Sequence, residues 1–140
     1  MNMLFTTLQT INTLIFLGIS GIHFYWAFGG KLGVNAVIPE MEGKTVFNPP
    51  FLATIGVSVA MLIAAWVSWT PNGNTNNNIL IYGNLGIGII FLIRAIGDFK
   101  YVGFSKKVKG SVFAKNDTRY YSPLCLVIST IGFFVYLTIK

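Results

Sequence analysis

The sequence predicts an all-α polytopic membrane protein, a single domain over residues 1–140 in which four transmembrane helices form an antiparallel bundle. Three observations predict this fold. Only 10% of the 140 residues are charged, whereas a soluble domain has about 25%, and the mean hydropathy is +0.66. The apolar residues gather in four blocks, each close to the roughly 20 residues that cross a bilayer. Short polar or proline-containing segments separate the blocks.

The four blocks are expected to be transmembrane helices, and signals at their ends agree with this. They cover residues 3–28, 51–70, 79–99 and 123–139. The first has no Lys or Arg before it and is longer than the apolar part of a signal peptide, so we expect it to be retained. The second follows Asn48, Pro49 and Pro50. The fourth opens with Ser122 as an N-cap and Pro123 at the first helical position.

Positive charge predicts the orientation in the cell membrane. The short polar run 71–78 makes the second and third spans antiparallel neighbours. The basic residues of the first and third loops are Lys31, Lys44, Lys100, Lys106, Lys107, Lys109, Lys115 and Arg119. The N-terminal segment and the second loop have no basic residue. Because cytoplasmic loops carry the excess of Lys and Arg, we expect loops one and three in the cytoplasm and both termini outside.

Several classes of function are disfavoured by composition. The net charge of +6 does not indicate a nucleic-acid partner, because no zinc pattern, aromatic platform or extended basic arm accompanies it. Cys125 is the only cysteine, so no intramolecular disulfide is possible. With one cysteine and one histidine, His23, the chain cannot form a usual structural zinc site. We therefore expect no metal and no cofactor.

A candidate ligand site lies at the predicted cytoplasmic end of the spans. Arg94 and Asp98 are four residues apart, so a helix would place both on one stripe. Ionisable groups at membrane depth are costly unless they are paired or face protein. His23 and Trp26 lie in the cytoplasmic half of the first span, and Asp117 lies just before the fourth. We predict that these five residues bind a ligand, with His23 as a candidate acid or base.

Each of these residues also has a purely structural interpretation. Arg94 and Asp98 are then an intrahelical ion pair, with Arg94 extending to the headgroups. His23 is then an interhelical hydrogen-bonding residue, and Trp26 an anchor in the interfacial aromatic belt. Asp117 is then a solvated loop charge or the partner of a neighbouring cation. Their occurrence on one side of the membrane favours the functional interpretation, but it identifies no reaction, and whether the protein is an enzyme stays open.

Loop three is predicted to lie along the membrane surface. Residues 101–113 mix aromatic and apolar side chains with basic ones. The aromatic residues would dip into lipid, and the lysines would face anionic phosphate. The lipid-facing lysines are Lys106, Lys107 and Lys109. The same charges are explained equally well if they only set the side of the membrane on which the loop lies. Loop one adds the acidic residues Glu40 and Glu42 on this side.

Two stretches of the chain resemble one bacterial family. They are residues 23–39, HFYWAFGGKLGVNAVIP, and residues 94–129, which begin RAIGDFKYVGFSKK. The chain resembles a family of small four-span integral membrane proteins classed as a domain of unknown function, which implies a bacterial inner membrane. The family pattern falls on His23, Trp26, Gly29, Gly30, Gly33, Pro39, Arg94, Gly97, Asp98, Gly103, Phe113, Asp117, Tyr121, Ser122 and Pro123. Leu32 departs from it, because relatives often carry tryptophan there. The resemblance implies the fold and the location of the site, but no reaction.

The leading functional hypothesis is a site for a lipid-like or hydrophobic anionic ligand, open to the cytoplasmic leaflet. Arg94 would hold the anionic group, Asp98 would orient Arg94, His23 would transfer protons and Trp26 would form an apolar wall. The expected partners are membrane lipids and a hydrophobic small molecule, and a homo-oligomer is possible.

Two alternatives come from other functional classes. One is a non-catalytic accessory or scaffold protein whose third loop docks on a partner or on anionic lipid. The other is a proton- or ion-coupled carrier that uses His23, Asp98 and Arg94 as a relay. The carrier is the weaker hypothesis, because the outer half of the spans offers little beyond Asn84 and hydroxyl groups.

Overall fold

The protein folds into helices joined by short irregular segments. The computed structural model describes residues 3–41, 44–69 and 76–140, so Glu42 and most of the predicted loop 71–78 lie outside the described residues. The elements are α1 (Met3–Ala27), α2 (Val34–Val37), β1 (Glu40–Met41), β2 (Lys44–Thr45), α3 (Phe51–Ser68), α4 (Asn78–Ile96), α5 (Val112–Asn116), the π-helix η2 (Asp117–Tyr121) and α6 (Ser122–Ile139). Within these described ranges, four helical segments are long and apolar enough to cross a membrane, namely α1, α3, α4 and the continuous run Val112–Ile139. The predicted all-α membrane fold is confirmed.

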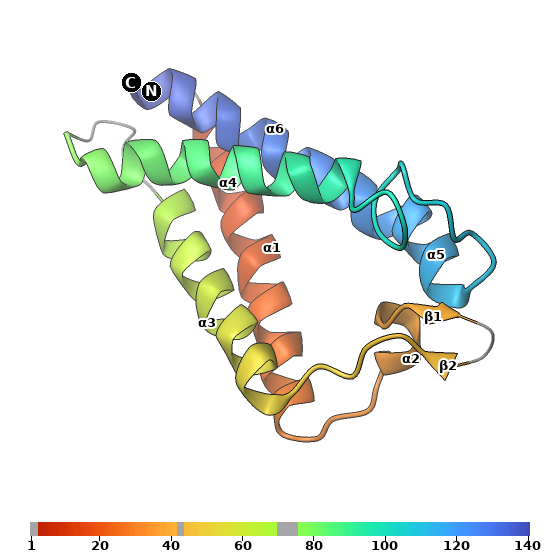
Figure 1. Ribbon diagram of the computed structural model, residues 1–140. Coiled ribbons are helices and arrows are strands. Elements are labelled where there is room, and N and C mark those ends of the chain that lie inside the picture. Colours follow the sequence, from red (N-terminus) through yellow and green to blue (C-terminus); the bar gives the residue numbers. More distant parts are fainter. Residues whose placement is uncertain (1–2, 42–43, 70–75) are drawn as a thin grey trace.

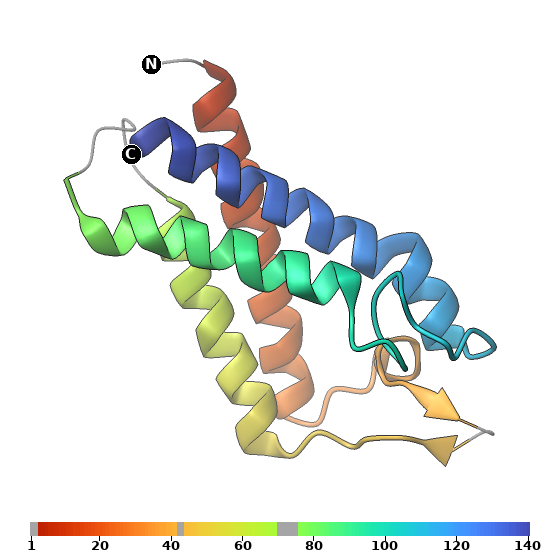
Figure 2. The ribbon, with the colours of Figure 1, turned by 45° about the horizontal axis from the view of Figure 1, so that its top comes forward.

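The long helices form two pairs. Helix α1 packs along α3, and α4 packs along α6 (Figure 1). The pairs cross near the end where α1 begins and α6 ends, and they diverge toward the opposite end (Figures 1 and 2). The connection that contains α2 and the antiparallel strands β1 and β2 lies between the diverging ends. Four spans thus bring both termini to the same end, and the membrane surface that this end faces stays a prediction.

Small polar residues join the helices within each pair. The Ser20 hydroxyl donates to the Ser58 carbonyl at 2.8 Å, and the Ser58 hydroxyl donates to the Ser20 carbonyl at 2.9 Å. The Ser129 hydroxyl donates to the Gly88 carbonyl at 2.7 Å. A Cβ added at Gly132 would lie 3.0 Å from the Gly88 nitrogen. Small residues therefore allow the close helix contacts that are typical of membrane proteins.

Large apolar side chains point outward along all four long segments. Leu14 of α1 is 61% exposed, Leu52 of α3 76%, Ile90 of α4 63% and Leu137 of α6 72%. Serine, asparagine and glutamine side chains are meanwhile buried between the helices. Such a surface would be an aggregation hazard in water but suits contact with lipid chains, which supports the assignment of the four spans.

Two helix boundaries differ from the prediction by more than two residues. Helix α4 ends at Ile96 because Gly97 adopts a φ of 97°, a backbone conformation that favours glycine. The last helical run begins at Val112 rather than at Ser122, and its N-cap is Ser111, whose hydroxyl accepts from the Ala114 nitrogen at 3.1 Å. The prediction treated residues 112–121 as loop because they are polar and basic, but the burial of Phe113 stabilises the helix there.

Candidate functional site

Asp117 is the centre of a buried charged cluster at the diverging end of the helix pairs. It is fully buried. One carboxylate oxygen, Oδ1, accepts from the Arg94 Nη2 at 3.0 Å. The other, Oδ2, accepts from the Lys106 Nζ at 2.9 Å, the Gly103 nitrogen at 2.8 Å and the Ser122 hydroxyl at 3.2 Å. The interpretation of Asp117 as a solvated loop charge is wrong, and its role in ligand binding stays a prediction. We call these five residues the Asp117 cluster.

The π-helix η2 explains why Asp117 and Ser122 meet. In a π-helix the backbone bonds run from residue i+5 to residue i, and the Ser122 nitrogen donates to the Asp117 carbonyl. Residues five apart therefore align, so the Ser122 hydroxyl also reaches the Asp117 carboxylate. Ser122 is thus a partner of Asp117 rather than the predicted N-cap. Single-turn π segments within α-helices are frequent at functional sites.

Lys106 is buried, although the sequence predicts a lipid-facing side chain. Only 3% of it is exposed. Besides Asp117, its Nζ donates to the Gly103 carbonyl at 2.8 Å and to the Thr118 hydroxyl at 2.7 Å. A buried lysine needs these partners to offset its loss of hydration. The prediction for Lys106 is therefore wrong, whereas Lys107 and Lys109 are exposed.

The irregular segment 97–106 delivers Gly103 and Lys106 to the cluster, and Asp98 organises it. Oδ1 of Asp98 accepts from the backbone nitrogens of Lys100, Tyr101 and Val102 at 2.9, 2.7 and 2.9 Å. Burial by itself would raise the pKa of Asp98, but these backbone donors hold its pKa below the usual value.

The predicted Arg94–Asp98 ion pair is replaced by the Arg94–Asp117 pair. The side chains at 94 and 98 share a stripe only if the helix continues past both, and α4 ends at Ile96. The segment then turns back sharply, so that a Cβ added at Gly97 would lie 1.7 Å from the Val102 carbonyl oxygen.

Arg94 is the accessible member of the cluster. Its side chain is 33% exposed, whereas those of Asp117 and Lys106 are 0% and 2% exposed. Its Nη1 atom is buried and has no hydrogen-bond partner among the described residues. Two cations share one carboxylate, so the cluster carries one unbalanced positive charge.

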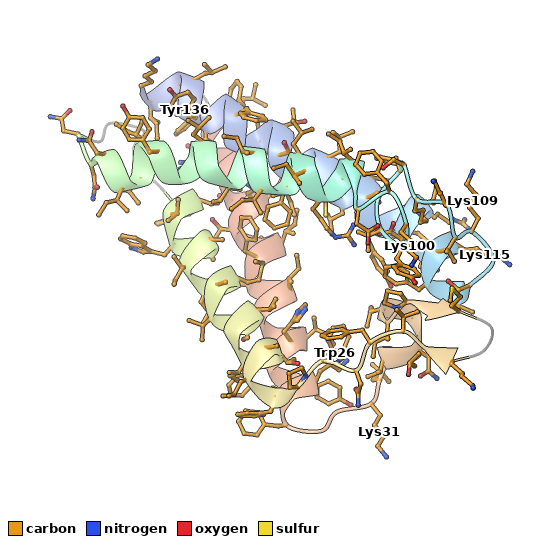
Figure 3. The ribbon with its side chains drawn as sticks, in the orientation of Figure 1. Trp26, Lys31, Lys100, Lys109, Lys115 and Tyr136 are labelled. Atoms are coloured by element: carbon orange, nitrogen blue, oxygen red, sulfur yellow. The ribbon has the colours of Figure 1, made fainter. Side chains whose placement is uncertain are left out.

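His23 and Trp26 form a separate group on α1. The His23 Nδ1 bonds to the Ile19 carbonyl at 2.8 Å, and the centroids of the His23 and Trp26 rings are 5.1 Å apart. The Trp26 Nε1 donates to the Leu32 carbonyl at 2.8 Å, which fixes the turn after α1. Figure 3 shows Trp26 at the end of α1, in the α1–α3 pair, whereas Lys100 and Lys109 lie in the segment that connects α4 to α5. Among the contacts of the described residues, none joins His23 or Trp26 to Arg94.

The sequence analysis missed the direct roles of Gly103, Lys106 and Ser122. Gly103 and Ser122 belong to the family pattern given above, which was the available signal for them. Nothing in the basic run around Lys106 distinguishes it from Lys107. Among the described residues, no three His, Cys, Asp or Glu side chains are grouped in a way that would hold a metal ion.

Comparison with known families agrees with this architecture. The model of the family described as Protein of unknown function (DUF3995) matches residues 16–131. The chain belongs to this family. No curated protein and no solved structure matches the chain. The matched range includes every residue of the Asp117 cluster together with His23 and Trp26, and the predicted membership of a family of unknown function is confirmed.

Proposed function

We propose that this membrane protein binds the anionic group of a lipid-like molecule through Arg94, at the cytoplasmic end of its spans. The observation that carries the proposal is the unbalanced charge of the Asp117 cluster. Arg94 and Lys106 both bind Asp117, and Arg94 alone is partly exposed. A cation at the edge of the hydrocarbon region is stabilised by an anion, and a guanidinium matches the geometry of a phosphate or carboxylate.

The surroundings of the cluster support an anionic ligand. The described cationic side chains that are exposed at this end are Lys31, Lys44, Lys100, Lys107, Lys109, Lys115 and Arg119. By the positive-inside rule, they and Arg94 belong to the cytoplasmic side, where the leaflet carries anionic lipid. In this proposal Arg94 holds the anion, whereas His23 and Trp26 are predicted ligand residues in a separate group on α1 that no contact within the described part of the chain joins to Arg94. Asp98 acts indirectly, because its bonds to segment 97–106 hold Lys106 on Asp117.

Mass spectrometry of lipids that copurify with the protein tests the proposal. We expect wild-type protein to retain one anionic lipid-like species in excess of its share of the membrane. Arg94→Ala should reduce that excess at least tenfold. Arg119→Ala is the matched control, since Arg119 is exposed and its guanidinium lies 5.3 Å from the Tyr120 ring centroid. Bulk membrane lipids in the same proportions in all three proteins would contradict the proposal.

A scaffold role is the second candidate, favoured by the exposed Lys107 and Lys109. These side chains are free of the cluster that holds Lys106, so they are available to an acidic partner. If this role holds, Lys107→Ala with Lys109→Ala abolishes capture of the partner from the same membranes, while Arg94→Ala and His23→Ala leave it intact. The opposite pattern of losses would exclude a simple scaffold.

A further inference from the structure

The packed core at the crossing of the helix pairs is divided into two apolar clusters. The terminal cluster consists of Phe5, Ile131, Val135 and Ile139. The central cluster consists of Phe16, Ala64, Ala65, Val67, Ile87 and Ile128. Four buried polar side chains, which we call the polar layer, occur at the level between them: Gln9, Asn12, Ser68 and Asn84.

Helical spacing places the polar layer at the boundary between the clusters. On α1, Phe5, Gln9, Asn12 and Phe16 lie on one stripe, at intervals of four, three and four residues. Phe5 belongs to the terminal cluster and Phe16 to the central one, so the two amides come between them.

The other two members lie at the same level on α3 and α4. Asn84 is three residues from both Ile81, which packs on the terminal cluster, and Ile87 of the central cluster. The Asn84 Nδ2 donates to the Val67 carbonyl at 3.0 Å, next to Ser68 at the end of α3. The polar layer thus contains residues of α1, α3 and α4 at the level where the two helix pairs cross (Figure 1).

The polar layer holds polar atoms that are sealed from solvent and lack partners. Asn12 is 0% exposed, and neither atom of its amide group has a hydrogen-bond partner among the described residues. The unpartnered atoms are Gln9 Nε2, Asn12 Nδ2, Asn12 Oδ1, Ser68 Oγ and Asn84 Oδ1. Native proteins seldom leave buried polar atoms unpaired, and ordered water is the usual partner when no protein group serves.

We propose that the polar layer is a water-binding site between the two helix pairs. The unpartnered set contains amide nitrogens, which donate, and amide oxygens, which accept, together with a hydroxyl that does both. A water molecule satisfies this mixture, whereas a cation would use only the oxygens. Binding requires the pairs to separate slightly at the crossing, because their present packing seals these atoms. The site is independent of Arg94, which lies toward the other end of α4.

Cysteine reactivity in a Cys125→Ala background tests the proposal. Asn12→Cys places a thiol in the polar layer, and Ile128→Cys places one in the central cluster, where Ile128 is also 0% exposed. The probe is methyl methanethiosulfonate, which reacts with thiolates and therefore needs local water. We expect Asn12→Cys to react at least tenfold faster than Ile128→Cys in vesicles of phosphatidylglycerol and phosphatidylcholine. Equal rates would show a dry layer and overturn the proposal.

Thermal unfolding of Asn12→Leu gives a second measurement that does not depend on the cysteine variants. If water bridges the layer, leucine removes those bridges and the Tm falls. If the layer is dry, leucine replaces an unpartnered amide and the Tm rises, which overturns the proposal. The wild-type Tm is expected to be the same in NaCl, KCl and N-methylglucamine chloride at equal ionic strength. A higher Tm in one of the metal salts would identify a cation site instead.

Discussion

The Asp117 cluster and the polar layer are both buried at helix contacts, but they differ in charge and in how completely their atoms are paired. In the cluster, Asp117 accepts four hydrogen bonds, and Lys106 donates three. In the polar layer, both amide atoms of Asn12 lack partners within the part of the chain that the structure describes. The protein itself therefore holds the side chains of the Asp117 cluster in place. The polar layer instead leaves donors and acceptors free for the water that we propose. Charge at membrane depth demands fixed partners far more strongly than a neutral amide does.

Removing the anion of the cluster is expected to have the largest effect on stability. Asp117→Asn keeps the shape of the side chain but leaves Arg94 and the buried Lys106 without a counter-charge. Stranding a buried charge costs about 3–5 kcal/mol, which urea titration in detergent micelles would measure. The double variant Asp117→Asn with Lys106→Met should recover a large part of the loss. A loss below about 1 kcal/mol would mean that the cluster is solvated and no more preorganised than the polar layer.

Distorting segment 97–106 should have the next largest effect, because this segment delivers two partners to Asp117. Gly103 has a φ of 85°, and an added Cβ would lie 2.4 Å from the Gly97 Cα. We expect Gly103→Ala to lose about 2–4 kcal/mol from backbone strain and overpacking. Gly110→Ala is the control, because a Cβ there meets nothing within 4 Å. Equal unfolding midpoints for the two variants would contradict this account of the segment.

The sequence was sufficient for the spans but not for the pairing of the charges. Hydropathy reports burial in lipid directly, which is why four spans were predictable. The pairing of Arg94 depended on where α4 ends, and Gly97, a residue type typical just past a helix end, was an available signal for that. The burial of Lys106 had no local signal, since it follows from a contact with Asp117 eleven residues away. The burial of Gln9 and Asn12 had a weaker signal than that of the charged residues, because a neutral amide at membrane depth is less costly than a charge.

Protonating Asp98 should weaken the cluster indirectly and by a smaller amount. Backbone donors hold the pKa of Asp98 below its usual value, and in the unfolded chain the carboxyl has a pKa of about 3.9. Its contribution to stability is therefore full above the unfolded pKa and is lost as the pH falls through the folded pKa. Thermal unfolding from neutral pH downward would show Asp98→Asn less stable than wild type, with the gap closing in acid. A gap that does not change with pH would remove Asp98 from this role.

Replacing the amide of Asn84 is expected to have the smallest effect, and it tests the neutral side of the comparison. Asn84→Leu loses the hydrogen bond of 3.0 Å to the Val67 carbonyl but strands no charge, so we expect a loss of about 1 kcal/mol. Ser129→Ala is the matched control within the α4–α6 pair, where the Ser129 hydroxyl bonds the Gly88 carbonyl and a loss of similar size is expected. Urea titrations of Asn84→Leu, Ser129→Ala and Asp117→Asn would compare the loss in free energy of unfolding between the polar layer and the Asp117 cluster. If Asn84→Leu lost as much as Asp117→Asn, the polar layer would be as firmly paired as the cluster, and the contrast between them would rest on charge alone.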